Sequence, residues 1–425
     1  MIQLIQGVLL IATFVIFIIF AMRGGNLTVG FLCMAIAWTV IGLIPIKTAM
    51  TDIFTTPVIN YGKTAIYIIL GSWFGRVLVD TGIAGSISRR TAKVGNKAPV
   101  IATLLISVVI ALIFTSAYGV GSSIAVGVIL FPIMFSMGVP KNIAVTVFTL
   151  STGAAMYINP VLFNQFIVFF KGVSWGDKYL KFGFVAMAVQ LLITFIFILV
   201  SIRKIRNGKP IVLENQEPEA EIKEVSAFTY ILPIVPVALS IFLAWDSIPA
   251  LLLSTILAFL LTGNMKNYKD FVSMMNASAK TAIGDIGGLL IMLFILTMFQ
   301  AAAVHTVGEF TNIFKHMIPN NPLLLVVIIA IIAPLAYFRG PLMLYGAGAA
   351  TAAVLTATGY FNGWFLYGLL VVPSMMGISS CVTQSWNLWA VQFTKLDVKT
   401  FFKTGMPWAW AATIVNLFVA FNLLK

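Results

Sequence analysis

The feature that most limits the possible folds is a series of long apolar runs, such as Ile2 to Met22, Leu27 to Ile46 and Phe182 to Ile202. Each has roughly the 20 residues that a helix needs to cross the hydrocarbon core of a bilayer. Inside lipid, every backbone N–H and C=O group must find a partner within the protein, so only helices and closed barrels can span it. Barrel strands would be about half as long and would alternate apolar with polar residues. Hydrophobic residues make up 60% of the chain and charged residues 9%, so we expect a helical protein whose surroundings are the lipid bilayer.

The chain also contains an internal duplication. The sequence Tyr-Gly-Val-Gly at residues 118–121 returns as Tyr-Gly-Ala-Gly at 345–348, and Gln165-Phe166 returns as Gln392-Phe393 at the same offset. In both copies the glycines interrupt an apolar stretch. Paired interruptions at matching places are typical of the binding site of a secondary transporter.

Each half of the chain predicts five crossings and one additional hairpin. The crossings are expected near 2–22, 26–46, 58–79, 142–170 and 182–202, then near 228–244, 248–263, 284–302, 364–393 and 405–424. The hairpins are expected at 98–138 and 322–357, and the crossings at 142–170 and 364–393 are broken by polar residues. Because five is an odd number, the second copy enters the membrane from the opposite side. The prediction is an all-α polytopic membrane protein of about ten transmembrane helices in two inverted-topology repeats, 1–206 and 226–425, joined by a linker at 207–225.

The distribution of positive charge predicts the orientation. With the linker in the cytoplasm, seventeen of the 26 Lys and Arg residues fall on the inner side and seven on the outer side. Both termini are then outside, and the protein is a multi-pass protein of the plasma (cytoplasmic) membrane. Basic amphipathic stretches at 85–97 and 266–282 are expected along the inner interface. The net charge of +13 therefore concerns topology, and no nucleic-acid partner is expected.

The two hairpin tips are the first candidates for a binding site. Half-helices that end inside the membrane leave backbone N–H or C=O groups unpaired, and opposed half-helices aim such groups at one point. Alternatively, the small residues serve helix packing. The tip candidates are Ser116, Gly119, Gly121, Ser122, Ser123, Arg339, Gly340, Gly346 and Gly348.

Arg339 stands out among the tip residues because a charged side chain at membrane depth is costly. Its counterpart in the first repeat is Leu112. A guanidinium binds a carboxylate in bidentate fashion, so Arg339 is the leading candidate for holding the anionic group of a substrate. The alternatives are a structural salt bridge or a side chain that reaches toward the outer interface. Arg76, the other arginine at membrane depth, is a weaker candidate.

The broken crossings supply hydroxyl and amide groups. Pro160 removes one helical hydrogen bond, and the second break carries an even denser group of polar residues at 379–387. These side chains either bind a substrate or tie neighbouring helices together. The candidates for substrate binding are Thr152, Asn159, Ser379, Thr383, Gln384 and Asn387.

A coupling ion would use the same region or a titratable group nearby. Hydroxyls, amides and freed carbonyls can coordinate Na⁺ without a carboxylate, whereas a proton needs a titratable side chain. The candidates for ion coupling are Ser151, Asn164, Ser380, Asp80, Asp285 and His305. We find no catalytic or metal-binding motif, so we expect neither an enzyme nor a cofactor beyond a coupling Na⁺ or H⁺.

The run from Leu70 to Gly82, followed by the Gly/Ser hairpin and the polar broken helix, resembles the ion transporter superfamily of carboxylate carriers. The nearest branches are the gluconate permeases and citrate transporters. The resemblance implies a homodimer whose transport part carries two re-entrant hairpins and two unwound helices and moves as an elevator. In this chain the tips correspond to 115–123 and 339–348, and the unwound segments to 151–159 and 379–387. The Ser-Asn-Thr signature of the dicarboxylate branch is absent from both tips, which leaves Na⁺ and H⁺ coupling equally open.

The sequence therefore predicts symport of a small organic anion, such as a hydroxy- or keto-carboxylate, by elevator-type alternating access. A cation/proton antiporter or an amino-acid carrier of the same fold is the main alternative. An ion channel is a further alternative, although the difference between Arg339 and Leu112 argues against a symmetric filter.

Overall fold

The computed structural model describes residues 2–23, 25–92, 98–210, 225–243, 245–309 and 319–425, and within these residues the chain forms helices and no strand. The elements of the N-terminal half are α1 (Ile2–Met22), α2 (Leu27–Ile41), α3 (Ile46–Thr48), the π-helix η1 (Ala49–Ile53), α4 (Thr56–Asp80), α5 (Ile83–Ala92), α6 (Pro99–Phe114), α7 (Val120–Ser136), α8 (Lys141–Ala155), α9 (Pro160–Phe166), the 3-10 helix η2 (Ile167–Phe169), α10 (Asp177–Val200) and α11 (Ile202–Arg206). The elements of the C-terminal half are the 3-10 helix η3 (Ala227–Ile234), α12 (Val235–Phe242), α13 (Ser247–Leu261), α14 (Tyr268–Glu309), α16 (Pro322–Ile332), the 3-10 helix η4 (Ala333–Arg339), α17 (Gly348–Ala357), α18 (Gly363–Ser380), α19 (Ser385–Phe393) and α20 (Val398–Leu424).

The predicted class of an all-α polytopic membrane protein is confirmed. In the described part of the chain, five helices are long and apolar enough to cross a membrane, or six if the bent pair α8 and α9 is one span. Six further apolar helical stretches of 10–17 residues are present in the described part of the chain, among them α2, α6 and α13. Helices of this length fall short of the roughly 20 residues that a lone crossing requires, whereas α1 and α4, with 21 and 25 residues, are long enough.

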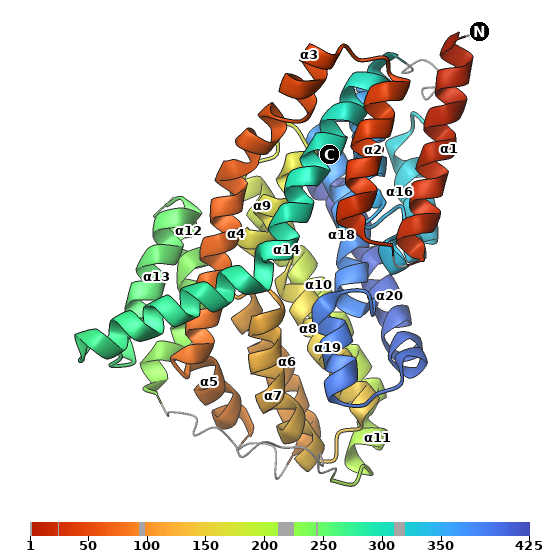
Figure 1. Cartoon of the computed structure of the whole chain (residues 1–425). Coiled ribbons are helices and arrows are strands. Elements are labelled where there is room, and N and C mark those ends of the chain that lie inside the picture. Colours follow the sequence, from red (N-terminus) through yellow and green to blue (C-terminus); the bar gives the residue numbers. More distant parts are fainter. Residues whose placement is uncertain (1, 24, 93–97, 211–224, 244, 310–318) are drawn as a thin grey trace.

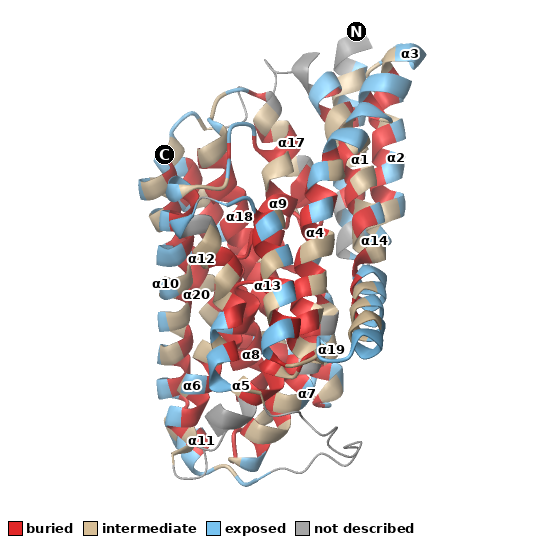
Figure 2. Cartoon of the chain, turned by 90° about the vertical axis from the view of Figure 1, so that its left-hand side faces the viewer, coloured by how far each residue is buried: buried red, intermediate tan, exposed pale blue. Residues whose placement is uncertain are grey.

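The two hairpins lie at opposite ends of the molecule. In Figure 1, α6 and α7 lie side by side at the lower end, whereas α16 lies at the upper end; Figure 2 shows α17 there too. The first hairpin turns at residues 115–119, in the interior, where Gly119 adopts a φ of +94° that an L side chain rarely accepts. The second hairpin turns through η4 and the irregular segment 340–347.

The two broken helices form the centre of the fold. The axes of α8 and α9 differ by 69°, and α18 and α19 are separated at residues 381–384. The most apolar 18-residue segment of the span formed by α18 and α19 is 94% buried, compared with 33% for the corresponding segment of α10. Figure 2 shows the buried residues gathered around α8, α9 and α18, with exposed residues on the outer helices. The backbone at the two breaks is therefore largely enclosed by protein, as irregular backbone at membrane depth requires.

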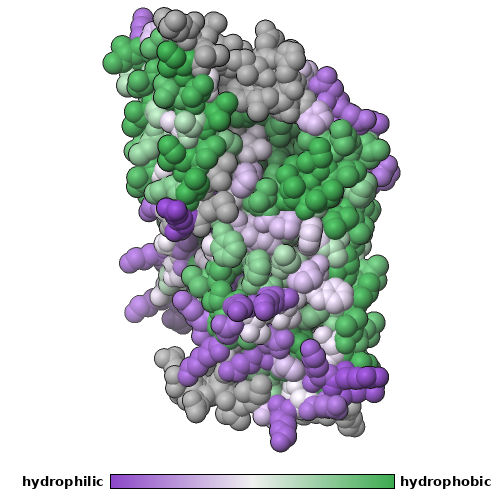
Figure 3. All heavy atoms as spheres, turned by 90° about the vertical axis from the view of Figure 1, so that its right-hand side faces the viewer, coloured by the Kyte–Doolittle hydropathy of each residue, from purple (hydrophilic) through white to green (hydrophobic). Residues whose placement is uncertain are grey.

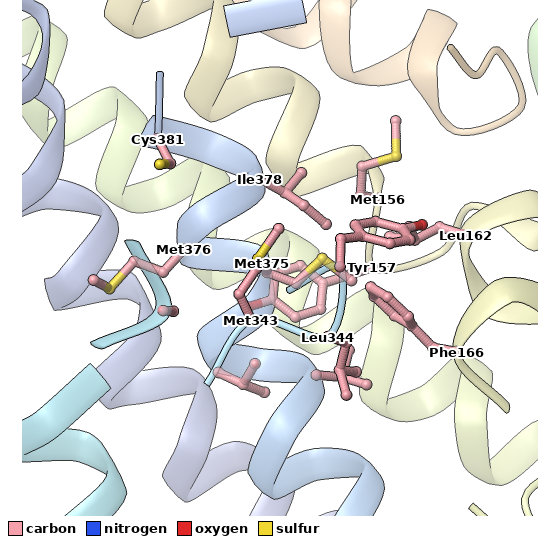
Figure 4. Close-up of a cluster of buried hydrophobic side chains, with 14 of the residues drawn as sticks. Met156, Tyr157, Leu162, Phe166, Met343, Leu344, Met375, Met376, Ile378 and Cys381 are labelled. Atoms are coloured by element: carbon pink, nitrogen blue, oxygen red, sulfur yellow. The ribbon is translucent and has the colours of Figure 1, made fainter. Parts of the chain in front are cut away.

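Apolar side chains of the second hairpin fill the space between the two broken helices. Figure 4 shows Met343 and Leu344 between Met156 and Phe166 on one side and Met375 on the other. All five side chains are buried, with at most 2% of their surface exposed. Since methionine adapts to irregular spaces, these residues seal the region around the helix breaks with apolar material.

Two expected elements differ from the observed ones. From Tyr268 onward, the inner stretch 266–282 and the crossing 284–302 form one continuous helix, α14, which changes direction along its length (Figure 1). The expected crossing 228–244 is the 3-10 helix η3 followed by the short α12, because Pro233 and Pro236 lack the N–H groups that a regular α-helix needs.

Both termini lie in the upper part of the molecule, and α11 lies at the opposite end (Figures 1 and 2). Figure 3 shows hydrophilic side chains gathered over the lower end, below a mainly hydrophobic surface. Residues 211–224 of the expected linker and 93–97 of the basic stretch 85–97 lie outside the described residues.

Candidate functional site

The two tyrosines that begin the duplicated motif meet in the interior. The hydroxyl oxygens of Tyr118 and Tyr345 lie 3.2 Å apart, although the residues are 227 positions apart in the chain. Gln165 Oε1, from α9, accepts hydrogen bonds from both hydroxyls, at 3.0 Å from Tyr118. All three side chains are buried. Two hydroxyl protons serve three contacts, so this Tyr–Gln–Tyr cluster has more than one hydrogen-bond arrangement.

Equivalent positions of the two repeats therefore touch each other in the cluster, but only one of the two equivalent glutamines takes part. Gln165 is fully buried beneath the tyrosines, whereas Gln392, its counterpart at the same offset, is exposed on α19. The geometry is symmetric in the tyrosines and asymmetric in the glutamines. This asymmetry is what two conformationally different copies of one repeat produce.

Arg339 joins the second hairpin to the second broken helix. Its Nη1 donates to the Tyr345 carbonyl at 3.0 Å, and its Nη2 donates to the Thr383 carbonyl at 2.7 Å. Phe338 and Arg339 both have positive φ, 54° and 64°, a conformation that costs about 1–2 kcal/mol for each L residue. The fold accepts this strain where the chain turns and brings the guanidinium toward the helix break.

The guanidinium of Arg339 forms no ion pair with an acidic side chain of the described residues. The ion pair within these residues joins Arg76 to Asp80. Arg339 is close enough to interact electrostatically with the Tyr118 and Tyr345 hydroxyls. Two of its five N–H groups are held by backbone carbonyls, and neither carbonyl neutralises the charge. A positive charge thus remains uncompensated beside the Tyr–Gln–Tyr cluster.

Buried polar atoms without partners gather at the second helix break. Among the described residues, Gln384 Oε1, Trp386 Nε1 and Asn387 Oδ1 are buried and make no hydrogen bond. The Trp386 ring packs edge-on against the Tyr118 ring, with centroids 6.0 Å apart, so this group adjoins the cluster. Gln165 Nε2 is also unpartnered. Buried polar groups are nearly always hydrogen-bonded, so these atoms indicate a place for a ligand or for water.

The amide groups of Asn159 and Asn387 hold the helix breaks in shape. Asn159 Nδ2 donates to the carbonyls of Phe114 and Ala117 at 2.9 and 3.0 Å, which ties the first hairpin tip to the first break. Asn159 Oδ1 meanwhile accepts from the first N–H groups of α9. Asn387 Nδ2 donates to the carbonyls of Ile378 and Cys381. Both amides satisfy backbone groups that the broken helices leave unpaired.

The hydroxyls of the broken helices lie where α8 and α18 approach closely. Ser379 Oγ accepts from Gln190 Nε2 at 2.9 Å, and the same Gln190 amide donates to the Leu150 carbonyl. A Cβ at Gly153 would lie 1.8 Å from Ser379 Oγ, so only glycine permits this approach. Thr152 donates to its own helix, at the Phe148 carbonyl.

The hydroxyls of the first hairpin tip are all bonded within the protein. Ser116 donates to the Pro233 carbonyl, and Ser122 and Ser123 donate to the carbonyls of Tyr118 and Gly119. Their lone pairs remain available to accept. The remaining tip glycines lie in or beside the hairpin turns. Gly340 and Gly346 lie in the irregular segment after Arg339, Gly121 lies in the first helical turn of α7, and Gly348 is the first residue of α17.

The candidates for ion coupling are dispersed. Asp80 is paired with Arg76, with Nε and Oδ1 2.9 Å apart, and His305 is exposed near the end of α14. Asp285 is exposed on α14, within electrostatic reach of Arg76. A Cβ at Gly119 would lie 3.9 Å from its neighbour Ile286, so Asp285 is next to a residue that borders the first tip.

The three hydroxyl and amide candidates for ion coupling differ in how far they are satisfied. Ser380 shares a hydrogen bond of 2.7 Å with the Tyr337 hydroxyl, and Asn164 Nδ2 donates to the Pro160 carbonyl. Ser151 Oγ, on α8, is buried without a partner in the described part of the chain. Of the three, Ser151 has its full hydrogen-bonding capacity free.

Sequence reasoning did not include Tyr118, Tyr345, Gln165, Gln190 or Trp386 among the site residues. Tyr118, Tyr345 and Gln165 carried a usable signal, because they are the side chains that the duplication retains. Gln190 and Trp386 carried no local signal, since their role depends on contacts with distant residues.

No family model and no curated protein matches this sequence. The structure is similar to that of the Alcanivorax borkumensis YdaH transporter, which was described as having an unusual topology. The TM-score is 0.55 at 12% sequence identity, and the similarity covers 86% of each chain. At this identity the comparison establishes the fold. The protein is thus a polytopic helical membrane protein with the fold of a solved transporter.

Proposed function

We propose that this protein is a secondary active transporter that moves a small organic anion, such as a hydroxy- or keto-carboxylate, together with H⁺ or Na⁺. The observation that carries the proposal is the uncompensated guanidinium of Arg339, held between the second hairpin and the second helix break. Transport rather than catalysis is supported by the fold shared with a solved transporter.

The charge of Arg339 supports an anionic substrate on energetic grounds. An arginine at the centre of a membrane helix costs about 2.5–3.5 kcal/mol on insertion scales, and backbone carbonyls recover only part of this cost. A carboxylate would supply the missing negative charge through charge-assisted hydrogen bonds, worth about 1.5–3 kcal/mol. The unpartnered side-chain atoms of Gln384, Trp386 and Asn387 would then hydrogen-bond the other polar groups of the substrate.

The geometry also supports alternating access by inverted repeats. The hairpins lie toward opposite ends of the molecule (Figure 1), and the equivalent residues Tyr118 and Tyr345 of their tips meet in the interior. The sequence resembles the carboxylate carriers of the ion transporter superfamily, and the nearest branches are the gluconate permeases and citrate transporters. This resemblance implies a homodimer whose transport part moves as an elevator. We extend that mechanism to this chain, with the 207–225 linker in the cytoplasm and both termini outside. Ser151 and Asp285 are the side chains we favour for Na⁺ and for H⁺ coupling respectively.

An amino-acid carrier or a cation/proton antiporter would need a negative group beside the same tips. The recorded hydrogen bonds of Tyr118, Tyr345, Gln165 and Arg339 involve no carboxylate among the described residues. A cluster that contains a guanidinium and hydrogen bonds to no carboxylate favours an anionic substrate over a cationic one. A membrane-embedded filter for ions would not need the asymmetry that Arg339 introduces.

The test is uptake into liposomes that contain the purified protein. A labelled carboxylate from a panel of hydroxy- and keto-acids should accumulate under an inward Na⁺ or H⁺ gradient. Arg339→Ala should lower uptake by about tenfold to a hundredfold, the equivalent of one lost charge-assisted hydrogen bond. The control is Arg203→Ala, which removes an exposed cation on α11.

A binding measurement separates recognition from folding. The transported carboxylate should raise the thermal unfolding temperature of the wild-type protein and of Arg203→Ala, and should leave Arg339→Ala unchanged. Undiminished uptake by Arg339→Ala would refute the role of the guanidinium. Accumulation of amino acids but of no simple carboxylate would favour the alternative carrier.

A further inference from the structure

A second polar site lies at the lower end of the molecule, away from the helix breaks. A hollow of about 290 Å³ opens between the start of α8, the end of α10 and the N-terminal half of α20. Its polar lining residues are Asn142, Ser201, Lys204, Lys403 and Thr404. No carboxylate is among them.

The polar side of the hollow has the chemistry of a phosphate site. Lys204 follows the end of α10 and Lys403 lies on α20, so two flexible ammonium groups come from separate elements. Asn142 Nδ2 and Thr404 Oγ1 lie 3.4 Å apart and add an amide and a hydroxyl. Lysine binds phosphate as a point charge, and the second N–H of the Asn142 amide can donate to the anion beside it, while the Thr404 hydroxyl donates to the Thr400 carbonyl.

The other side of the hollow is apolar and continues onto the hydrophobic surface. The Phe197 and Trp408 rings pack with centroids 5.5 Å apart, and Val200 has 69% of its surface exposed. Val200 ends a long apolar helix whose outward residues, such as Leu199, are also exposed. Figure 3 shows hydrophilic side chains meeting a hydrophobic surface toward this end of the protein. Trp408, in the N-terminal half of α20, thus adds an aromatic surface to the apolar wall.

We infer that this hollow binds the headgroup of an anionic phospholipid, with the phosphate between Lys204 and Lys403 and the acyl chains along Phe197 and Val200. A free phosphate ion would use the lysines but would gain nothing from the apolar wall. A lipid uses both. Basic pockets between membrane helices on the cytoplasmic side are known to bind such headgroups, and the site matches the predicted inner face.

The alternative is that both lysines merely orient the protein in the membrane, as cytoplasmic lysines generally do. The chain offers a matched control for this alternative. Lys266 and Lys269 are also exposed cations on the predicted inner side, and they do not line the hollow. Orientation alone would make the two pairs of lysines equivalent for lipid binding.

The experiment measures lipid binding to the purified, delipidated full chain in detergent by native mass spectrometry. The probes are phosphatidylglycerol, phosphatidylcholine and inorganic phosphate. We expect saturable binding of phosphatidylglycerol that is about thirtyfold weaker in K204Q/K403Q, because each lysine near an anionic headgroup contributes about fivefold. K266Q/K269Q should bind as the wild type does, and K204R/K403R should retain binding.

Three outcomes would overturn the inference. They are equal affinity of K204Q/K403Q and the wild type, equal affinity for phosphatidylcholine and phosphatidylglycerol, and displacement of the lipid by low concentrations of inorganic phosphate. A further variant, Trp408→Leu, keeps both charges and removes the indole from the wall. It should weaken the binding of the lipid and leave any binding of inorganic phosphate unchanged.

Discussion

The asymmetry between Gln165 and Gln392 gives a sharp test of the central cluster, because the two residues are equivalent in the duplication. Gln165→Ala removes the acceptor that both Tyr118 and Tyr345 use. The two hydroxyls then have only each other, so one proton can be donated between them and the other is left without an acceptor. Gln392→Ala changes an exposed side chain.

The expected magnitude follows from these contacts. One buried hydroxyl without an acceptor costs about 1–3 kcal/mol. Truncating the glutamine also leaves a small cavity, with about 0.8 kcal/mol for each buried methylene lost. The variant simultaneously removes the unpartnered Gln165 Nε2, which offsets part of the cost. We therefore expect Gln165→Ala to lower the free energy of unfolding by about 2 kcal/mol, and Gln392→Ala to change it by about 0.5 kcal/mol or less.

The assay is reversible unfolding of the purified protein in mixed micelles, followed by circular dichroism. A double-mutant cycle of Gln165→Ala with Tyr118→Phe isolates the hydrogen bond from the cavity, and the coupling should lie near the range of about 0.6–1.7 kcal/mol found for bonds between membrane helices. Equal destabilisation by Gln165→Ala and Gln392→Ala, or strict additivity with Tyr118→Phe, would refute the structural role of the cluster.

Further predictions concern packing, conformational exchange and topology. Gly153→Val should destabilise the protein by about 1–3 kcal/mol, because a Cβ there meets Ser379 Oγ. Gly284→Ala, where a Cβ would meet nothing within 4 Å, should be nearly neutral in the same unfolding assay. If the repeats exchange conformations during transport, a cysteine replacing Gln392 should react with a soluble thiol reagent in the conformation of this structure. It should become protected when reversal of the coupling-ion gradient favours the opposite conformation. A cysteine replacing Gln165 should show the opposite pattern, and matching patterns would exclude the exchange. A reporter fused at either terminus should be accessible from outside the cell, whereas a cytoplasmic signal would reverse the proposed orientation.

Local sequence signals predicted the elements of the fold well where their cause is local. The expected hairpin 98–138 corresponds to α6 and α7, and the first break was expected beside Pro160, which is the first residue of α9. Apolar length, proline and glycine act on their own stretch of backbone, so they can be interpreted without knowledge of distant contacts. The prediction failed where no strong helix-ending signal is present: residues 268–302 contain glycines but no proline, and the expected interface segment and crossing form the single α14.

The polar site shows the limit of that approach. The sequence by itself determined that the tyrosine motif is duplicated, and it predicted that Arg339 lies at membrane depth in a hairpin tip. It did not determine that Arg339 donates hydrogen bonds to the carbonyls of Tyr345 and Thr383, or that Asp80 forms an ion pair with Arg76. Each polar side chain has several possible hydrogen-bond or ion-pair partners in the sequence, and its position in the chain does not show which partner lies close to it in the fold.

Only the tertiary structure decided which equivalent residues meet and which of the two glutamines serves them. Tyr345 and Gln165 are 180 positions apart, and their contact depends on how two hairpins and two broken helices converge. The composition of the chain requires helices in lipid because unpaired backbone groups are costly there. The choice between Gln165 and Gln392 has no such local cause. It arises because two copies of similar sequence take up different conformations in one fold, and that difference is a property of the packing between them.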